Sequence, residues 1–122
     1  MKQVDTGDAQ LSLLDDRVVI VETKAGVILD RNKTRRFYEI VEQLVPGDYS
    51  LVINRKHDYR LMRFEVYSIA NSHQRLKGVA LVVTKKTAER MAELEAPLCQ
   101  KPFARFGNLE EAVNWARNLH RG

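Results

Sequence analysis

An uninterrupted apolar run at residues 78–83, Gly-Val-Ala-Leu-Val-Val, constrains the fold of this chain more than any other feature. A strand with one face in water alternates apolar and polar residues, whereas a strand of a parallel sheet, covered on both faces, is apolar throughout. The run is far shorter than the ~20 residues that a membrane-spanning helix needs. Residues 78–83 are therefore expected to form a central parallel strand in a sheet that is covered by helices.

Short apolar segments at residues 49–53 and 103–106 predict two further strands, the first of them covered on both faces. A helical pattern separates each of the three predicted strands from the next, and strands joined in this way follow right-handed crossovers. The three strands are therefore expected to be largely parallel.

Apolar residues at helical spacing follow each of these strands. The first helix is predicted over residues 62–76, although this segment also contains a stretch that could extend a strand. Thr87 can cap the second helix, and Pro97 bends or ends its last turn. Asn108 and Glu111 match a capping box at the start of the last helix.

The amino-terminal part is predicted to contribute a hairpin and a helix. Apolar strands at residues 11–14 and 18–21 flank two aspartates, which is typical of an antiparallel hairpin with a tight turn. From Asp30 the apolar period becomes helical, at Phe37, Ile40, Val41, Leu44 and Val45. The predicted fold class is therefore α/β, with a mixed sheet that begins with an antiparallel hairpin, continues with three strand-helix units and is flanked by helices.

Composition favours a single domain without a tail of low complexity. The chain has 122 residues, of which 44% are hydrophobic and 30% charged, the balance of a globular protein. Residues 1–8 are expected to be a flexible tail and residues 9–122 one domain. Cys99 is the only cysteine, and no segment resembles a signal peptide or a membrane span. A cytoplasmic location and no membrane insertion are expected.

Three parts of the chain carry a resemblance to a known family: the hairpin, the strand at residues 78–84, and the closing segment at residues 103–115. With these the chain resembles bacterial proteins of the STAS type, the SpoIIAA-like group, which is also related to lipid-binding CRAL-TRIO domains. The resemblance implies a SpoIIAA-like fold and a non-enzymatic regulatory role, with protein partners, nucleotides or lipids as ligands. The stretch that matches the family's phosphorylated serine, residues 54–60, contains no serine or threonine, so that switch is not expected here.

The residues that metal and catalytic sites require are scattered. His57, His73, His120 and Cys99 lack the spacing of a zinc site, and the glycines form no phosphate-binding loop. Cys99 is expected to be an inert, buried thiol. Four glutamates on predicted helices are expected to form solvated faces: Glu42, Glu89, Glu93 and Glu95. No catalytic residue, metal or cofactor is therefore predicted.

Basic residues concentrate where the predicted strands lead into helices. The segments at residues 24–36, 55–63 and 84–90 hold twelve of the chain's twenty basic residues and three of its sixteen acidic ones. Ligands of open α/β sheets usually bind at this rim, outside the carboxyl ends of the strands. The sequence therefore predicts that the rim binds an anionic small ligand or an acidic protein partner, through Arg55, Lys56, His57, Tyr59, Lys85 and Lys86. The alternative is that these basic side chains are exposed to solvent and bind no ligand or partner.

Other functions rank below this one. A carrier of a small molecule or lipid would use an apolar pocket beneath Tyr59, Phe64 and Tyr67. Nucleic-acid binding has little support, because no recognition motif is present and Tyr59 is the only aromatic residue in the basic segments. Phe37 lies just beyond these segments and is better placed in the core. A homodimer stays open, since an edge strand can pair without leaving a sequence signature.

Overall fold

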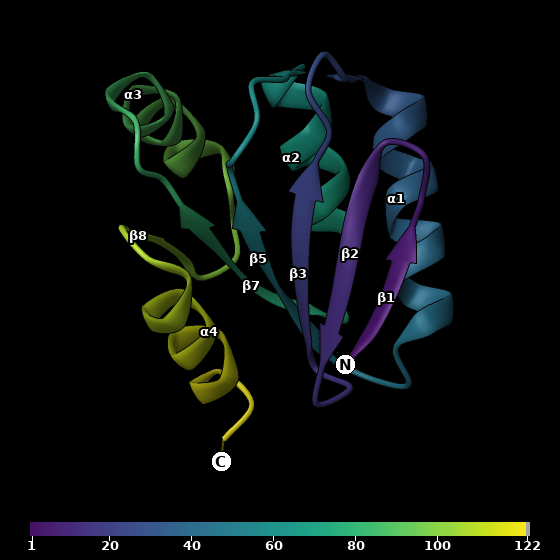
Figure 1. Cartoon of the computed structure of the whole chain (residues 1–122). Coiled ribbons are helices and arrows are strands. Elements are labelled where there is room, and N and C mark those ends of the chain that lie inside the picture. Colours follow the sequence, from purple (N-terminus) through teal and green to yellow (C-terminus); the bar gives the residue numbers. More distant parts are fainter. Residues whose placement is uncertain (122) are drawn as a thin grey trace.

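A computed structural model describes residues 1–121 and has a mixed sheet of six strands (Figure 1). The strands lie in the order β1-β2-β3-β5-β7-β8; β1, β2 and β3 are antiparallel, and β3, β5, β7 and β8 are parallel. Their bounds are Lys2–Asp5 (β1), Ala9–Leu14 (β2), Val18–Thr23 (β3), Tyr49–Asn54 (β5), Leu76–Val82 (β7) and Phe103–Phe106 (β8). The predicted fold class is confirmed.

Four α-helices cover the two faces of the sheet: α1 (Arg31–Leu44), α2 (Arg63–Ser72), α3 (Lys86–Glu95) and α4 (Leu109–Asn118). The first three share one large hydrophobic core with the sheet, in which Val41, Ala70 and Ala92 are buried. The last helix forms a second core on the other face, where Ala112 and Ala116 pack near Val52 and Ala80. The central residues of β5 and β7, 51–53 and 79–82, are therefore apolar on both faces, because both faces are covered.

The six-stranded sheet extends to residues that were expected to lie outside the domain. Residues 1–8 were predicted as a flexible tail, but Lys2–Asp5 pair with β2 as strand β1. Val4 lies opposite Leu11 and packs against the main core. The prediction is wrong because a four-residue strand with one apolar side chain is too short to show an alternating pattern.

A second, smaller sheet also lacked a sequence signal. It consists of two parallel strands, β4 (Ile28–Leu29) and β6 (Arg60–Leu61), each directly before a helix. Two residues are too few for periodicity, and these strands form because the β3–α1 and β5–α2 connections meet in space. The pairing joins the beginnings of α1 and α2, which pack side by side (Figure 1).

Several predicted boundaries agree closely with the structure. Asp15 and Asp16 have φ angles of 54° and 59° in the hairpin turn, as a tight antiparallel turn requires. The Asn108 side chain accepts a hydrogen bond from the Glu111 backbone N–H and so caps α4. The helix predicted over residues 62–76 ends at Ser72, because Leu76 already belongs to β7. The cap of α3 is Lys85 rather than Thr87.

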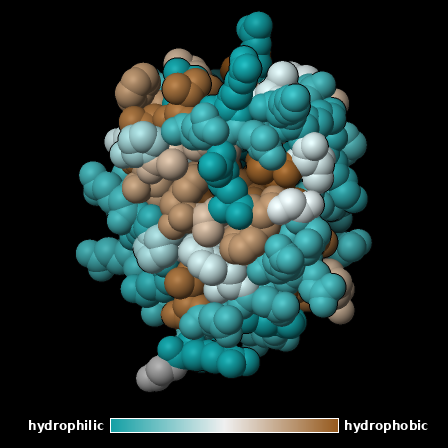
Figure 2. Space-filling view, turned by 90° about the vertical axis from the view of Figure 1, so that its left-hand side faces the viewer, coloured by the Kyte–Doolittle hydropathy of each residue, from teal (hydrophilic) through white to brown (hydrophobic). Residues whose placement is uncertain are grey.

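The two edges of the main sheet differ. β1 at one edge is mostly exposed and polar, whereas β8 at the other edge has two phenylalanines in four residues. Figure 2 shows apolar side chains gathered in the middle of the face that carries α3, β8 and α4. The homodimer remains a prediction, and β8 is the strand that such a pairing would extend.

Within residues 1–121, no helix has both the length and the hydrophobicity to cross a membrane.

Candidate functional site

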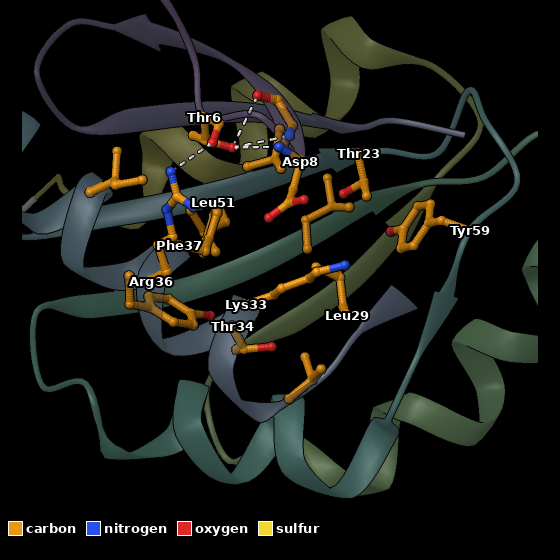
Figure 3. Close-up of a pocket in the computed structure, with 16 residues that line it drawn as sticks. Thr6, Asp8, Thr23, Leu29, Lys33, Thr34, Arg36, Phe37, Leu51 and Tyr59 are labelled. Carbon is orange, nitrogen blue, oxygen red and sulfur yellow. Dashed lines mark hydrogen bonds between the residues drawn. The ribbon is translucent and has the colours of Figure 1, made fainter. Parts of the chain in front are cut away.

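A cleft opens between α1 and the carboxyl ends of β3 and β5 (Figure 3). Its walls are Val21 of β3, Leu51 and Ile53 of β5, and Phe37 and Ile40 of α1. The cavity volume is about 60 Å³. Since a cavity of ~150 Å³ holds one benzene, this is room for roughly two or three heavy atoms. The cleft can therefore hold a small apolar group.

The strand pattern explains why the cleft is apolar. Val21 lies beside Ile53 in the parallel register, and Leu51 lies beside Val19 one step earlier. Alternate residues of neighbouring strands point to the same side of a sheet, so these side chains all face α1. Val21 and Leu51 are buried, whereas Ile53 near the end of β5 is only partly buried.

The turn between β1 and β2 forms one border of the cleft. The Thr6 hydroxyl accepts hydrogen bonds from the backbone N–H groups of Asp8 and Ala9, at 3.3 and 3.0 Å. Gly7 has φ of +95°, which favours glycine at this position. Arg36 Nη2 donates a long bond of 3.5 Å to the Thr6 carbonyl oxygen and so bridges α1 and the turn (Figure 3). This bridge is weak, and the border can open at little cost.

Two charged side chains line the cleft without a partner of opposite charge. Lys33 and Asp8 are both partly buried, and neither forms an ion pair with any residue in the described part of the chain. Figure 3 shows the Lys33 side chain extended along the cleft toward the side where Tyr59 lies. A partly desolvated ammonium gains more from an anion than an exposed one does. The cleft therefore offers apolar walls, a cation that forms no ion pair, and one carboxylate, that of Asp8.

The amino-terminal end of α1 does not itself provide an anion site. The Asp30 carboxylate accepts a bond of 2.9 Å from the Lys33 backbone N–H, and the Thr34 hydroxyl donates to the Asp30 carbonyl oxygen at 2.7 Å. Asp30 thus occupies the helix end and brings a negative charge. An anionic ligand in the cleft would have to rely on the side chains of Lys33 and Arg36.

The structure brings four of the six predicted rim residues together. Arg55, His57, Tyr59 and Lys85 line a second, smaller hollow of about 50 Å³. Lys85 lies 3.6 Å from the Asp58 carboxylate, so its charge is compensated there.

The other two rim residues lie apart from this hollow. Lys56 forms an ion pair with Glu22 at 3.4 Å, on another side of the β5 end. Lys86 is the first residue of α3 and does not line the hollow. The predicted anion site stays a prediction, and its residues are not gathered as one group.

Arg55 is occupied by a buried partner that the sequence did not indicate. Its Nη1 and Nη2 atoms donate to the two carboxylate oxygens of Glu95, at 2.7 and 2.5 Å, and its Nε donates to the Tyr59 hydroxyl. Burial acts to lower the pKa of Arg55, but the hydrogen bond with Glu95 and the nearby acidic groups together outweigh it, and the pKa is raised. Arg55 therefore stays charged and is held by Glu95 rather than presented to a ligand.

Glu95 corrects one prediction. It was expected on a solvated helix face, but it is fully buried and also accepts a hydrogen bond from the Tyr67 hydroxyl at 2.5 Å. Glu42 is likewise only partly exposed, and it accepts bonds from Tyr49 and from His73. The spacing of glutamates along a helix carries no signal for a partner on another element.

The carrier pocket expected beneath three aromatic residues does not form as one cavity. Tyr59 lines the α1 cleft, whereas Phe64 and Tyr67 border an open hollow on α2. Tyr67 is buried, and Phe64 is 68% exposed. The apolar cavity lies instead against α1, where Phe37 had been expected in the core.

A hydroxyl and an imidazole approach each other elsewhere, at the end of α4. Ser50 Oγ lies 2.9 Å from His120 Nε2, but the Ser50 side chain is fully buried. No substrate carbonyl could reach it, so the contact anchors the end of α4.

Within residues 1–121, no three His, Cys, Asp or Glu side chains are grouped to hold a metal ion. Burial raises the pKa of Cys99, which favours its protonated thiol.

Fold and site together define a mixed α/β domain with a small amphipathic cleft at the carboxyl ends of its parallel strands. Comparison of the chain with protein-family models, curated proteins and solved structures found no match. The resemblance to STAS-type proteins therefore stays an expectation from the sequence.

Proposed function

We propose that this chain is a non-enzymatic binding domain that holds a small amphipathic anion in the α1 cleft. The observation that carries the proposal is the combination of apolar walls with the unpaired, partly buried ammonium of Lys33. Ligand sites in proteins are typically concave and mostly apolar, with a few polar groups that fix orientation. The position at the carboxyl ends of β3 and β5 is also the usual one in open α/β sheets.

The size of the cavity sets the apolar part of the ligand. A volume of about 60 Å³ admits a group of roughly two or three heavy atoms, because a cavity of ~150 Å³ holds one benzene. A longer chain would need the turn at Thr6 to move away from Arg36. The favoured ligand class is therefore a short-chain carboxylate or the phosphate ester of a short-chain alcohol.

The cleft is preferred to the second hollow because of its charge balance. Glu95 already binds Arg55, and Asp58 lies beside Lys85, so the second hollow has little net positive charge to offer. Lys33 and Arg36 have no carboxylate partner in the described residues. A regulatory role of the STAS type in the cytoplasm, in which the bound anion alters contact with a protein partner, is the biological setting we propose.

The test is binding of straight-chain carboxylates from acetate to octanoate, followed by amide chemical shifts. We expect the tightest binding at a tail of roughly two or three carbons, with shifts at the residues that line the cleft. Native mass spectrometry of gently purified protein would show in parallel whether a ligand of this class is retained. The absence of shifts at Val21, Ile53 and Phe37 with every probe would refute the proposal.

A matched pair of variants separates recognition from general charge. Lys33→Met removes the ammonium but keeps the apolar stem, and we expect roughly tenfold weaker carboxylate binding. Arg35→Met removes the same charge from the same helix at a position outside the cleft lining, and should leave the affinity nearly unchanged. Equal losses in both variants would point to nonspecific attraction.

A further inference from the structure

The end of the molecule where α1 and α2 begin carries exposed apolar side chains. Of the five large apolar residues that are most exposed in residues 1–121, three lie here: Ile28 at 50%, Met62 at 47% and Phe64 at 68%. The register of the small sheet places Ile28 beside Arg60. Met62 follows Arg60 by two residues in extended backbone, so it returns to the same side. Ile28 and Met62 therefore share the outer face of the small sheet.

The inner face of the small sheet is already used. Leu29 and Leu61 are half-buried; Leu29 lines the α1 cleft and Leu61 lines the second hollow. The small sheet is thus apolar on both sides, and its outer side is left uncovered by any residue in the described chain. Burial inside the molecule cannot explain Ile28 and Met62.

Phe64 stands out from the surface beside them. It borders two open hollows of about 430 and 480 Å³, one along α2 and one shared with Arg31 and Arg35 of α1. An aromatic side chain between two hollows forms a ridge rather than the floor of a groove. The protruding Phe64 side chain can insert into a deformable surface.

Four arginines surround these apolar residues. Arg31, Arg35, Arg60 and Arg63 form no ion pair within residues 1–121. Glu65 is the acidic residue that lines the hollow shared by Phe64, Arg31 and Arg35. Other cations without an acidic partner, such as Lys33 and Arg36 in the α1 cleft, lie outside this face. The exposed apolar side chains therefore stand in a surface where the unpaired cations outnumber the acids.

We propose that this docking face, formed by Ile28, Met62 and Phe64 with Arg31, Arg35, Arg60 and Arg63, binds the surface of an anionic lipid bilayer. Apolar side chains that enter the interface and cations that meet lipid phosphates are the two contributions to peripheral membrane binding. A partner helix would need a groove, whereas the apolar side chains here protrude. The face does not depend on a ligand in the α1 cleft, and no helix spans the bilayer in this arrangement.

The test is sedimentation of the full chain, without added carboxylate, with vesicles of phosphatidylcholine alone and of phosphatidylcholine mixed with phosphatidylglycerol. Binding is expected only to the anionic vesicles and is expected to fall with salt. Arg31→Gln with Arg35→Gln should weaken it by about fivefold per arginine, roughly twenty-fivefold together. The control is Lys2→Gln with Arg121→Gln, which removes the same charge at the other end of the molecule (Figure 1).

A second pair of variants tests the apolar contribution. Phe64→Ala is expected to weaken binding to anionic vesicles severalfold, and Leu94→Ala, at another exposed apolar residue, is expected to change it little. The proposal is overturned if the wild-type chain fails to bind anionic vesicles, or if the control variants lose as much binding as the docking-face variants. Retention on immobilised polyglutamate without vesicle binding would assign the face to an acidic protein instead.

Discussion

The guanidinium of Arg55 and the carboxylate of Glu95 meet in a two-point ion pair between the end of β5 and the end of α3, forty residues apart in sequence. Both side chains are buried, and the Tyr67 hydroxyl from α2 adds a third bond to the same carboxylate. α3 also packs on the main core through Ala92, which is fully buried. The ion pair therefore adds to the packing that holds the end of α3 against the core.

Breaking this pair should destabilise the protein strongly. Glu95→Gln leaves the Arg55 charge buried without its partner, and we expect a loss of about 3–5 kcal/mol in the free energy of unfolding. Arg55→Met with Glu95→Leu removes both charges and should recover much of that loss. Urea unfolding measures both. Asp48→Asn, which disrupts the exposed pair with Lys77, is the control and should cost less than about 1 kcal/mol.

Gly78 should resist substitution because α4 lies against it. A Cβ atom there would come within 2.3 Å of Leu119 Cδ1 and 3.3 Å of the Pro102 carbonyl oxygen. The Leu119 side chain would have to move, and we expect Gly78→Ala to cost about 1–3 kcal/mol. Gly47→Ala meets no atom within 4 Å and should change the free energy of unfolding by no more than about 0.5 kcal/mol. A thermal scan in which both variants behave alike would contradict this packing.

The contact between Ser50 and His120 should make stability depend on pH. Burial, aided by the charge of Arg17, lowers the pKa of His120 below its ordinary value. The unfolded chain then binds more protons than the folded one between the lowered pKa and about 6.5, so stability rises with pH across that window and is lost on acidification.

The pH dependence of stability is expected to be small, and a substitution of His120 is expected to abolish it. The imidazole is only partly buried, so the effect should be a fraction of the ~1.4 kcal/mol that one full pKa unit represents. His120→Gln can still hydrogen-bond Ser50, but it does not titrate. Urea unfolding of both proteins from pH 8 to pH 5 should show the difference between them shrinking as the pH falls; a constant difference would contradict the titration of His120.

The fold could be predicted further than the site. The hairpin, the apolar strands and the Asn108 cap depend on residues that lie close together in the chain, and the structure confirms them. The predicted rim used the same topology, and Arg55, His57, Tyr59 and Lys85 do meet. What the rim argument missed is that Glu22 and Glu95 reach the same region from other elements and pair with Lys56 and Arg55, while Asp58 of the rim itself pairs with Lys85.

The sequence by itself determined the periods of its helices and strands, and with them a mixed α/β sheet, because backbone geometry converts spacing into buried faces. Only the tertiary structure decided which charges are neutralised and which apolar residues line a cleft. Lys33 forms no ion pair whereas Lys56 pairs with Glu22, and Phe37 is only partly buried whereas its neighbour Tyr38 is buried. Such differences depend on contacts between distant segments, and electrostatic and cavity energies follow distance in space rather than along the chain.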